Sequence, residues 1–274
     1  MSLPRAPRGD LQSYTRERFA HADFALDVFR KGSGPAVVVM TEIPGISPQV
    51  LGFADRLVAM GLSVVLPDLF GEAGRDPEGP GATLYAATTL AKVCVRREFT
   101  VLATGKTSPI VTWLRALAAD AHQRCGGPGV GVVGMCFTGG FALAMATDPR
   151  VLLPVLSQPG LPANLSVAHR RSIGVAEDEI DAVAARCSSE GLKVLGLRFH
   201  GDPLCPPERF QMLRERLGDA FIAVELDAKT AHPDSPMSKP HSVLTRDLID
   251  APGQPTHDAL QLVLRMLSTR LLPS

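Results

Sequence analysis

The chain has 274 residues, which is long enough for one large α/β domain or two small ones. Hydrophobic residues make up 45% and charged residues 20%, so we expect a packed core, and the formal net charge of zero argues against nucleic acid or an anionic membrane as the main partner. No apolar run approaches a membrane span, and residues 1–20 have the Pro, Arg and Gly content of a loose leader rather than a signal peptide.

Five cysteines are scattered along the chain and include no C-x-x-C pair. An odd count without such a pair is not typical of a disulfide framework or a structural zinc site, so we expect reduced thiols, a cytoplasmic location and no metal. The sequence also lacks a phosphate-binding loop, so no cofactor is expected. The cysteines are Cys94, Cys125, Cys136, Cys187 and Cys205.

Short apolar runs rich in Val, Ile and Leu alternate with longer amphipathic segments. This alternation predicts an α/β protein with a mostly parallel central sheet and helices on both faces. The expected strands cover residues 24–29, 36–42, 63–69, 129–135, 152–157, 193–199 and 221–226. The expected helices cover residues 47–61, 108–125, 137–147, 176–189, 207–218 and 256–272, and the first of them opens with a Ser-Pro cap.

Two long irregular stretches interrupt this pattern. A Gly/Pro-rich loop at residues 71–82 begins an insertion that runs to about residue 107, and a second stretch covers residues 227–242. Long loops in compact domains are often functional, and ligands bind at the carboxyl ends of parallel strands. We therefore expect both stretches at that edge of one domain over residues 21–274.

The sequence GVVGMCFTGG, residues 131–140, joins an expected strand to an expected helix at Cys136. A nucleophile displayed at such a turn, a nucleophile elbow, needs small neighbours because the backbone is strained and other segments pack closely. Gly134 precedes Cys136 by two residues, and Gly139 and Gly140 follow it. A lone cysteine is more often a buried core thiol, but this context favours a nucleophile whose thiolate the helix N-terminus stabilises.

The motif GMCFTGG resembles the G-x-C-x-G-G motif of the dienelactone hydrolase family, with Thr138 where the family usually has glycine. The resemblance extends from about residue 20 to the end of the chain. It implies the α/β-hydrolase fold, a three-layer α/β/α sandwich, and a carboxymethylenebutenolidase-like activity with a cysteine nucleophile. A β-branched residue at position 138 is expected to crowd the elbow slightly.

The thiol needs two partners, which in α/β-hydrolases follow the nucleophile in the order acid, then histidine. Asp202 lies just past an expected strand and is the candidate acid, and Pro206 keeps the spacing of the family's aspartate and proline. Of the histidines that follow, His257 opens the last helix and is expected to face away. His241 is favoured as the base because HSVL resembles the family's histidine, serine and apolar residues, and His232 is the alternative.

The resemblance also implies roles for residues at the end of the strand over 36–42. TEIPG matches the family's E-x-x-G, so Glu42 is expected to hold Cys136 as a neutral thiol at rest and then to accept its proton. The backbone N–H groups of Ile43 and Phe137 are expected to form an oxyanion hole. The candidates for binding a substrate carboxylate are Arg246, Arg96 and Arg97, each equally typical of a solvated surface arginine.

These residues predict the hydrolysis of a carboxylic ester by a Cys-His-Asp triad through a thioester acyl-enzyme. Because a thiolate leaves more readily than an alkoxide, we expect substrates with good leaving groups, above all enol lactones such as dienelactones. The expected partner is a small ester or lactone, and the expected state is a monomer or weak homodimer. The alternatives are a thiol redox protein that pairs Cys136 with Cys205, and a non-catalytic α/β-hydrolase-like binding protein.

Overall fold

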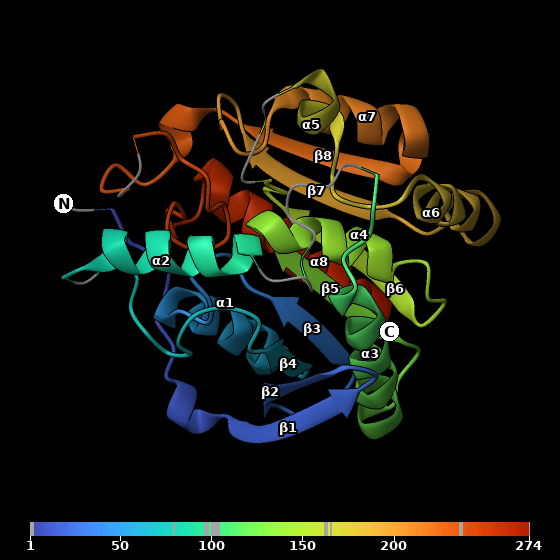
Figure 1. The fold of residues 1–274 in the computed structure, drawn as a ribbon. Helices are drawn as coiled ribbons and strands as arrows, with labels where there is room; N and C mark the ends of the chain where they lie inside the picture. The colour runs from blue at the N-terminus through green and yellow to red at the C-terminus, as the bar shows by residue number, and fades with distance from the viewer. Residues whose placement is uncertain are drawn as a thin grey trace.

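The computed structural model describes residues 3–78, 80–95, 99, 105–161, 164, 166–235 and 238–273, with the backbone alone for residues 94 and 95. An eight-stranded sheet crosses the molecule in the order β1-β2-β4-β3-β5-β6-β7-β8 (Figure 1). β1 and β2 are antiparallel to their neighbours, and the strands from β3 to β8 pair in parallel. The predicted α/β-hydrolase fold with a mostly parallel sheet is confirmed.

The parallel strands β3 to β7 are almost wholly buried, whereas β8, at the edge of the sheet, is half-buried over most of its length. The strands are β1 Thr15–His21, β2 Phe24–Lys31, β3 Ala36–Met40, β4 Ser63–Pro67, β5 Val130–Met135, β6 Val151–Ser157, β7 Val194–Phe199 and β8 Phe221–Leu226. The α-helices in the described ranges are α1 Pro48–Ala59, α2 Ala82–Val95, α3 Ile110–Cys125, α4 Gly139–Met145, α5 Val167–Arg171, α6 Glu177–Glu190, α7 Pro207–Leu217 and α8 Pro255–Leu271.

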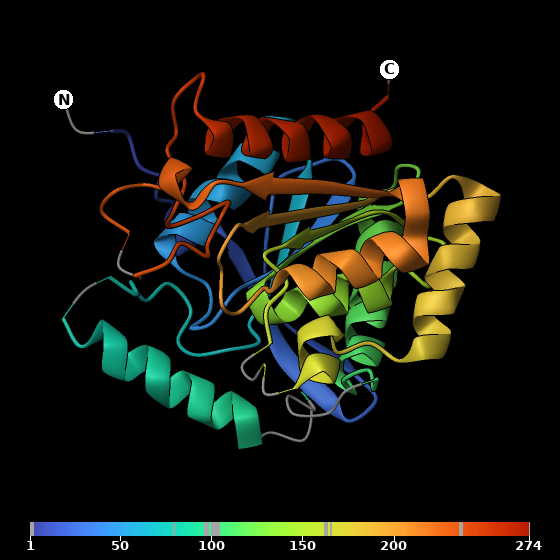
Figure 2. The ribbon, with the colours of Figure 1, turned by 90° about the horizontal axis from the view of Figure 1, so that it is seen from above.

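Helices cover both faces of the sheet, as Figure 2 shows from above. Successive side chains of a strand point to opposite faces, so β3 sends Val37 and Val39 into one core and Val38 and Met40 into the other. The first core is closed by α1 and α8, and the second by α3, α4, α6 and α7. In the described part of the chain, no helix is both long and apolar enough to cross a lipid bilayer.

All seven expected strands and all six expected helices are present, with small shifts at their ends, and β1, α2 and α5 are additional. α2 lies inside the insertion at 71–107, where the sequence predicts no regular structure. Its inward positions, Tyr85, Thr89 and Val93, are four residues apart and include only one aliphatic side chain. Most of the other residues of α2 are alanine or threonine. The sequence therefore shows no stripe of large apolar residues at helical spacing, which is the signal that predicts a helix.

Residues 3–20 differ from the expected loose leader because they pack on the domain. Ala6 and Tyr14 are buried, and the Tyr14 hydroxyl donates a hydrogen bond to Asp55 Oδ1 at 2.9 Å. Arg5 forms an isolated β-bridge with Ile249, and β1 pairs along its whole length with β2. Buried side chains, hydrogen bonds and strand pairing together hold this segment on the domain.

The substitution Gly52→Ala tests this packing. The backbone of the N-terminal segment crosses α1 so closely that a Cβ on Gly52 would lie 1.9 Å from the Pro7 carbonyl oxygen. Overpacking of this kind costs about 1–3 kcal/mol, against a gain of about 1 kcal/mol in helix propensity. We expect a lower Tm and faster tryptic cleavage after Arg8. A raised Tm with unchanged cleavage would mean that the segment does not rest on α1.

Candidate active site

The chain turns sharply at Cys136, where β5 ends. Cys136 has φ 56°, in the left-handed region that a non-glycine residue rarely adopts, and a 3-10 turn over Cys136–Thr138 leads into α4. A Cβ on Gly134 would lie 2.2 Å from the Thr138 carbonyl oxygen, and one on Gly139 would lie 2.6 Å from the Pro159 Cβ. Both glycines are therefore sterically required. The structure has the predicted strand–turn–helix, with Cys136 half-buried at its apex.

Thr138, which was expected to crowd the elbow, instead ties it to the neighbouring strand. Its side chain is fully buried, and its hydroxyl accepts a hydrogen bond from the Met135 N–H at 2.8 Å. The same oxygen lies 3.0 Å from the Met40 carbonyl oxygen at the end of β3, to which it can donate its proton. A glycine at this position would leave both backbone groups without that partner.

His241 and Asp202 form a buried pair beside Cys136. His241 Nδ1 lies 2.7 Å from Asp202 Oδ2, and the other carboxylate oxygen accepts the Leu204 N–H at 2.9 Å. His241 Nε2 is buried and has no hydrogen-bond partner among the described residues. A Cβ on Gly160 would lie 3.2 Å from Cys136 Sγ and 3.3 Å from His241 Cε1, so the sulfur and the imidazole lie close to the same point. Cys136, Asp202 and His241, which follow one another in the predicted chain order, are thus brought together in space.

The charge on His241 depends on its two neighbours. Burial opposes the imidazolium form, but the nearby Cys136 sulfur and the hydrogen-bonded Asp202 carboxylate outweigh it and raise the pKa of His241 well above its ordinary value of 6.5. The backbone N–H of His241 donates to Asp247 Oδ2 at 2.7 Å, and this bond fixes the loop that carries the imidazole ring. Carboxylates therefore hold both the ring of His241 and the loop that carries it.

His232, the alternative base, has a different place. It is buried, its Nδ1 accepts the Asp234 N–H at 3.2 Å, and its Nε2 lies 3.1 Å from the Leu3 carbonyl oxygen. Since Nδ1 accepts, Nε2 carries the proton and donates it to that carbonyl. Nε2 thus holds the N-terminal segment and Nδ1 holds the histidine's own loop, so the geometry favours His241 over His232.

Glu42 is buried beside the elbow, but its carboxylate faces the loop that carries His241. Ser242 donates to Glu42 Oε2 at 2.7 Å, and Thr245 donates to Oε1 at 2.6 Å. Gln158 adds a third bond, from Nε2 to Glu42 Oε2 at 3.3 Å, and its own Oε1 accepts the Val243 N–H. Three side chains therefore satisfy Glu42, and its predicted contact with the Cys136 thiol is not among the bonds of the described residues.

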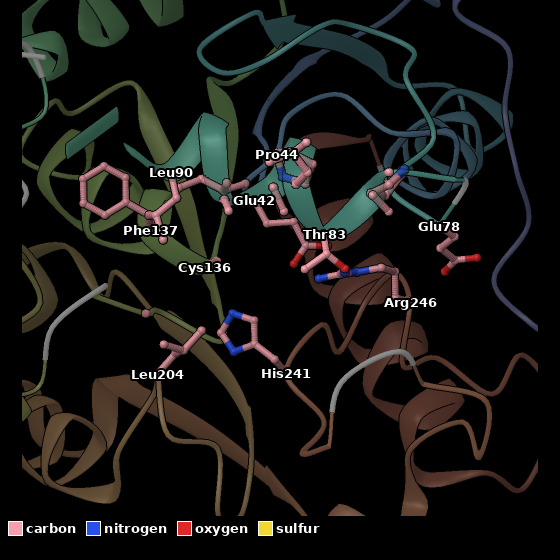
Figure 3. A pocket seen from close by; sticks show the side chains of 18 of the residues that line it. Glu42, Pro44, Glu78, Thr83, Leu90, Cys136, Phe137, Leu204, His241 and Arg246 are labelled. Atoms are coloured by element: carbon pink, nitrogen blue, oxygen red, sulfur yellow. The ribbon is translucent and has the colours of Figure 1, made fainter. Parts of the chain in front are cut away.

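One cavity joins most of the predicted residues (Figure 3). Glu42, Ile43, Cys136, Phe137, His241 and Arg246 all line it. Arg246 donates to Ser242 Oγ at 3.2 Å and, within the described ranges, pairs with no carboxylate. The two residues of the predicted oxyanion hole therefore border the same space as the nucleophile and a guanidinium group.

Two of the predicted residues, Arg96 and Arg97, lie outside the described residues. Among the residues that are described, no group of three or more His, Cys, Asp or Glu side chains is arranged to hold a metal ion. The cysteines whose side chains the structure describes are all free thiols: Cys125, Cys136, Cys187 and Cys205.

The sequence did not predict several of the residues that support the site. Gln158, Ser242 and Thr245 all bond Glu42, and Gln158 also accepts the Val243 N–H. Asp247 acts through the backbone of the His241 loop. The buried guanidinium of Arg209 donates to the Pro159 carbonyl at 2.8 Å and the Leu204 carbonyl at 2.7 Å, on the two loops that flank the site.

The comparison with protein families agrees with this geometry. Residues 25–157 match the model of the Dienelactone hydrolase family. These residues belong to that family. The protein is a carboxylic ester hydrolase, and the matched segment contains Glu42 and Cys136. No curated protein sequence matches the chain.

Solved structures share the fold of this hydrolase at low sequence identity. A candidate dienelactone hydrolase from Klebsiella pneumoniae subsp. pneumoniae MGH 78578 is 16% identical with a TM-score of 0.58, over 93% of this chain and 98% of that one. A dienelactone hydrolase-like promiscuous phosphotriesterase from metagenomic libraries is 15% identical with a TM-score of 0.58, over 94% and 99%. A cold-adapted esterase from an Arctic intertidal metagenomic library is 14% identical with a TM-score of 0.54, over 97% and 100%.

Replacing Thr138 tests whether its hydroxyl holds the elbow. Thr138→Val keeps the shape but leaves the buried Met135 N–H and the Met40 carbonyl without this partner, at a cost of about 1–3 kcal/mol. For a domain of this size we expect a loss in Tm of roughly 2–4 °C per kcal/mol, together with a lower kcat. Thr138→Ser is the matched control and keeps both bonds. Equal Tm and kcat in all three proteins would contradict the role.

The pKa of His241 gives a second test. Cys136→Ala removes one of the two groups that raise this pKa, while burial still lowers it. The pKa of His241 should therefore fall in this variant. NMR titration of the imidazole C–H signals measures the change. The wild-type folded pKa lies above the unfolded one, so His241 stabilises the fold fully below pH 6.5 and less as the pH rises through the folded pKa. An unchanged His241 titration in Cys136→Ala would show that the two groups do not interact.

Proposed function

We propose that this hydrolase cleaves activated carboxylic esters, above all enol lactones, with Cys136, His241 and Asp202 as a triad. The observation that supports it most is the strained turn at Cys136, which displays the thiol next to a buried histidine already held by a carboxylate at 2.7 Å. The family match supports ester hydrolysis as the reaction class. The remaining steps follow from the chemistry of these groups.

Acylation begins with transfer of the Cys136 proton to His241 Nε2. The thiolate then attacks the carbonyl carbon of the ester, and the carbonyl π electrons move to oxygen, where the N–H groups of Ile43 and Phe137 would stabilise the oxyanion. As the carbonyl re-forms, the bond to the leaving oxygen breaks, and the imidazolium of His241 donates its proton to that oxygen. Asp202 holds the ring in place and stabilises its charged form.

Deacylation repeats the sequence with water as the nucleophile. His241 removes a proton from a water molecule, whose oxygen attacks the thioester carbonyl, and the tetrahedral intermediate then expels the Cys136 thiolate. The carboxylic acid leaves, and the proton on His241 returns to sulfur. The raised pKa of His241 suits a group that must hold a proton between these steps.

The choice of sulfur limits the substrate. A thiolate is expelled from the first tetrahedral intermediate more readily than an alkoxide, so an ordinary alkyl ester tends to return to substrate. An enolate or phenolate leaves more easily, which favours enol lactones and aryl esters. Arg246 lines the same cavity and is free of carboxylate partners in the described part of the chain, so it suits a carboxylate on the substrate.

Glu42 positions the His241 loop in this proposal. The bonds of Glu42 to Ser242 and Thr245 fix two residues that follow His241. Replacing Glu42 would therefore break several buried hydrogen bonds at once. Transfer of the thiol proton to Glu42 would require one of these bonds to be exchanged, and that role stays a prediction.

Kinetics of triad variants test the proposal. With p-nitrophenyl acetate and an enol lactone as substrates, Cys136→Ala and His241→Ala should each lose at least about 1000-fold in kcat, as is typical when one member of a triad is removed. Cys136→Ser keeps a nucleophile at the turn, and a large loss there would show that sulfur chemistry matters.

The matched control is His232→Ala, which removes a buried histidine outside the proposed triad. This variant should lose thermal stability because the Leu3 carbonyl and the Asp234 N–H lose their partner, yet keep most of its kcat. Wild-type turnover in both Cys136→Ala and His241→Ala would rule out the proposed triad. Loss of kcat in a folded His232→Ala, with His241→Ala active, would reassign the base.

A further inference from the structure

The cavity at Cys136 is larger than a small lactone needs. Its volume is about 1120 Å³, at or above the upper end of the roughly 300–1,000 Å³ that is usual for drug-sized ligands. Apolar side chains dominate the wall, including Leu84, Leu90, Phe137, Leu161 and Leu204. A substrate that filled only the space around the thiol would leave most of this apolar surface in contact with water.

The apolar and charged parts of the wall lie on opposite sides of the nucleophile. In Figure 3, Phe137, Leu90 and Leu204 lie to one side of Cys136, and Arg246 and Glu78 lie to the other. On the apolar side, the Phe137 ring packs against the Phe141 ring with centroids 5.1 Å apart and belongs to a wider aromatic cluster. The other members of that cluster are Phe70 and Phe99.

α2 forms the outer wall of the apolar side. Figure 2 shows α2, in teal, apart from the helices that cover the sheet. Tyr85 anchors it, since the Tyr85 hydroxyl accepts the Glu72 N–H at 2.6 Å. Leu84 and Leu90, on the cavity side, are 70% and 37% exposed, and they are two of only four large hydrophobic side chains exposed in the described ranges. A ligand that covered them would gain from removing this surface from water.

His241 determines which part of an ester lies on which side. It must donate its proton to the leaving oxygen, so the leaving group lies toward His241 and the loop that carries Arg246. The acyl group then extends the other way, between Phe137 and the cavity face of α2. The polar groups near Arg246 suit the leaving group, and the apolar wall suits the acyl group.

We propose that the natural substrate carries an extended apolar acyl arm, which lies against Phe137, Leu161, Leu204 and the Leu90 face of α2. This inference rests on the proposed function, because it uses the acyl-transfer step at Cys136. It places the substrate among esters, thioesters or lactones with a medium-length alkyl or comparably bulky apolar acyl group.

A series of p-nitrophenyl esters tests the arm, with acetyl, butanoyl, hexanoyl and octanoyl groups at concentrations below their solubility limits. In the full-length wild-type protein, kcat/KM should rise along the series by up to about fourfold for each buried CH₂. In Leu90→Asp, which places a carboxylate on the cavity wall, the ratio of octanoyl to acetyl kcat/KM should fall at least fivefold. The matched control is Ala91→Asp, the next residue of α2, which is exposed and does not line the cavity, and which should keep the wild-type ratio.

Each outcome bears on a different part of the account. A flat or falling series, with acetyl turnover that still requires Cys136, would overturn the apolar arm and leave the proposed function standing. Equal ratios in wild type and Leu90→Asp would show that the α2 face does not hold the acyl group. If no ester is turned over in a Cys136-dependent way, the proposed function fails and the inference fails with it.

Discussion

The left-handed backbone at Cys136 is the constraint around which the rest of the site is arranged. A non-glycine residue in this region costs about 1–2 kcal/mol, so the turn persists only where its surroundings hold it. Thr138 bonds the turn to β3 from one side, and the Gly160 N–H donates to the Cys136 carbonyl at 3.0 Å from the other. Because the turn is fixed by backbone and buried side chains, the thiol is held in position before any substrate binds.

The same tight packing links the site to distant parts of the chain. Glu42 follows β3 and is satisfied by residues near position 240, while Asp202 follows β7 and holds His241. Parallel strands bring these segments to one edge, where the loops between β strands and α helices meet. These hydrogen bonds are buried, so removing one member of the network leaves others without partners in a low-dielectric setting.

Local patterns made part of this arrangement predictable from the sequence. Alternating apolar runs predict the strands, and the glycines around Cys136 predict the elbow, because both signals lie within a few neighbouring residues. Thr138 was misjudged because the carbonyl that it bonds lies 98 residues away, and the partners of Glu42 lie about 200 residues away. α2 was missed because its anchors are a tyrosine, a threonine and a valine among alanines. The choice of Asp202 and His241 depended on the motif around Cys136, because that motif suggested the α/β-hydrolase fold and with it the order of acid and histidine along the chain.

The central claim is that Cys136 carries the acyl group during turnover. Quenching the wild-type protein in acid while it turns over p-nitrophenyl acetate, followed by intact-mass and peptide mass spectrometry, measures this most directly. We predict a single acetyl group on the peptide that contains Cys136, and no such adduct in Cys136→Ala. Turnover with the acetyl group on another residue, or with no covalent adduct under conditions where product forms in a burst, would contradict the account.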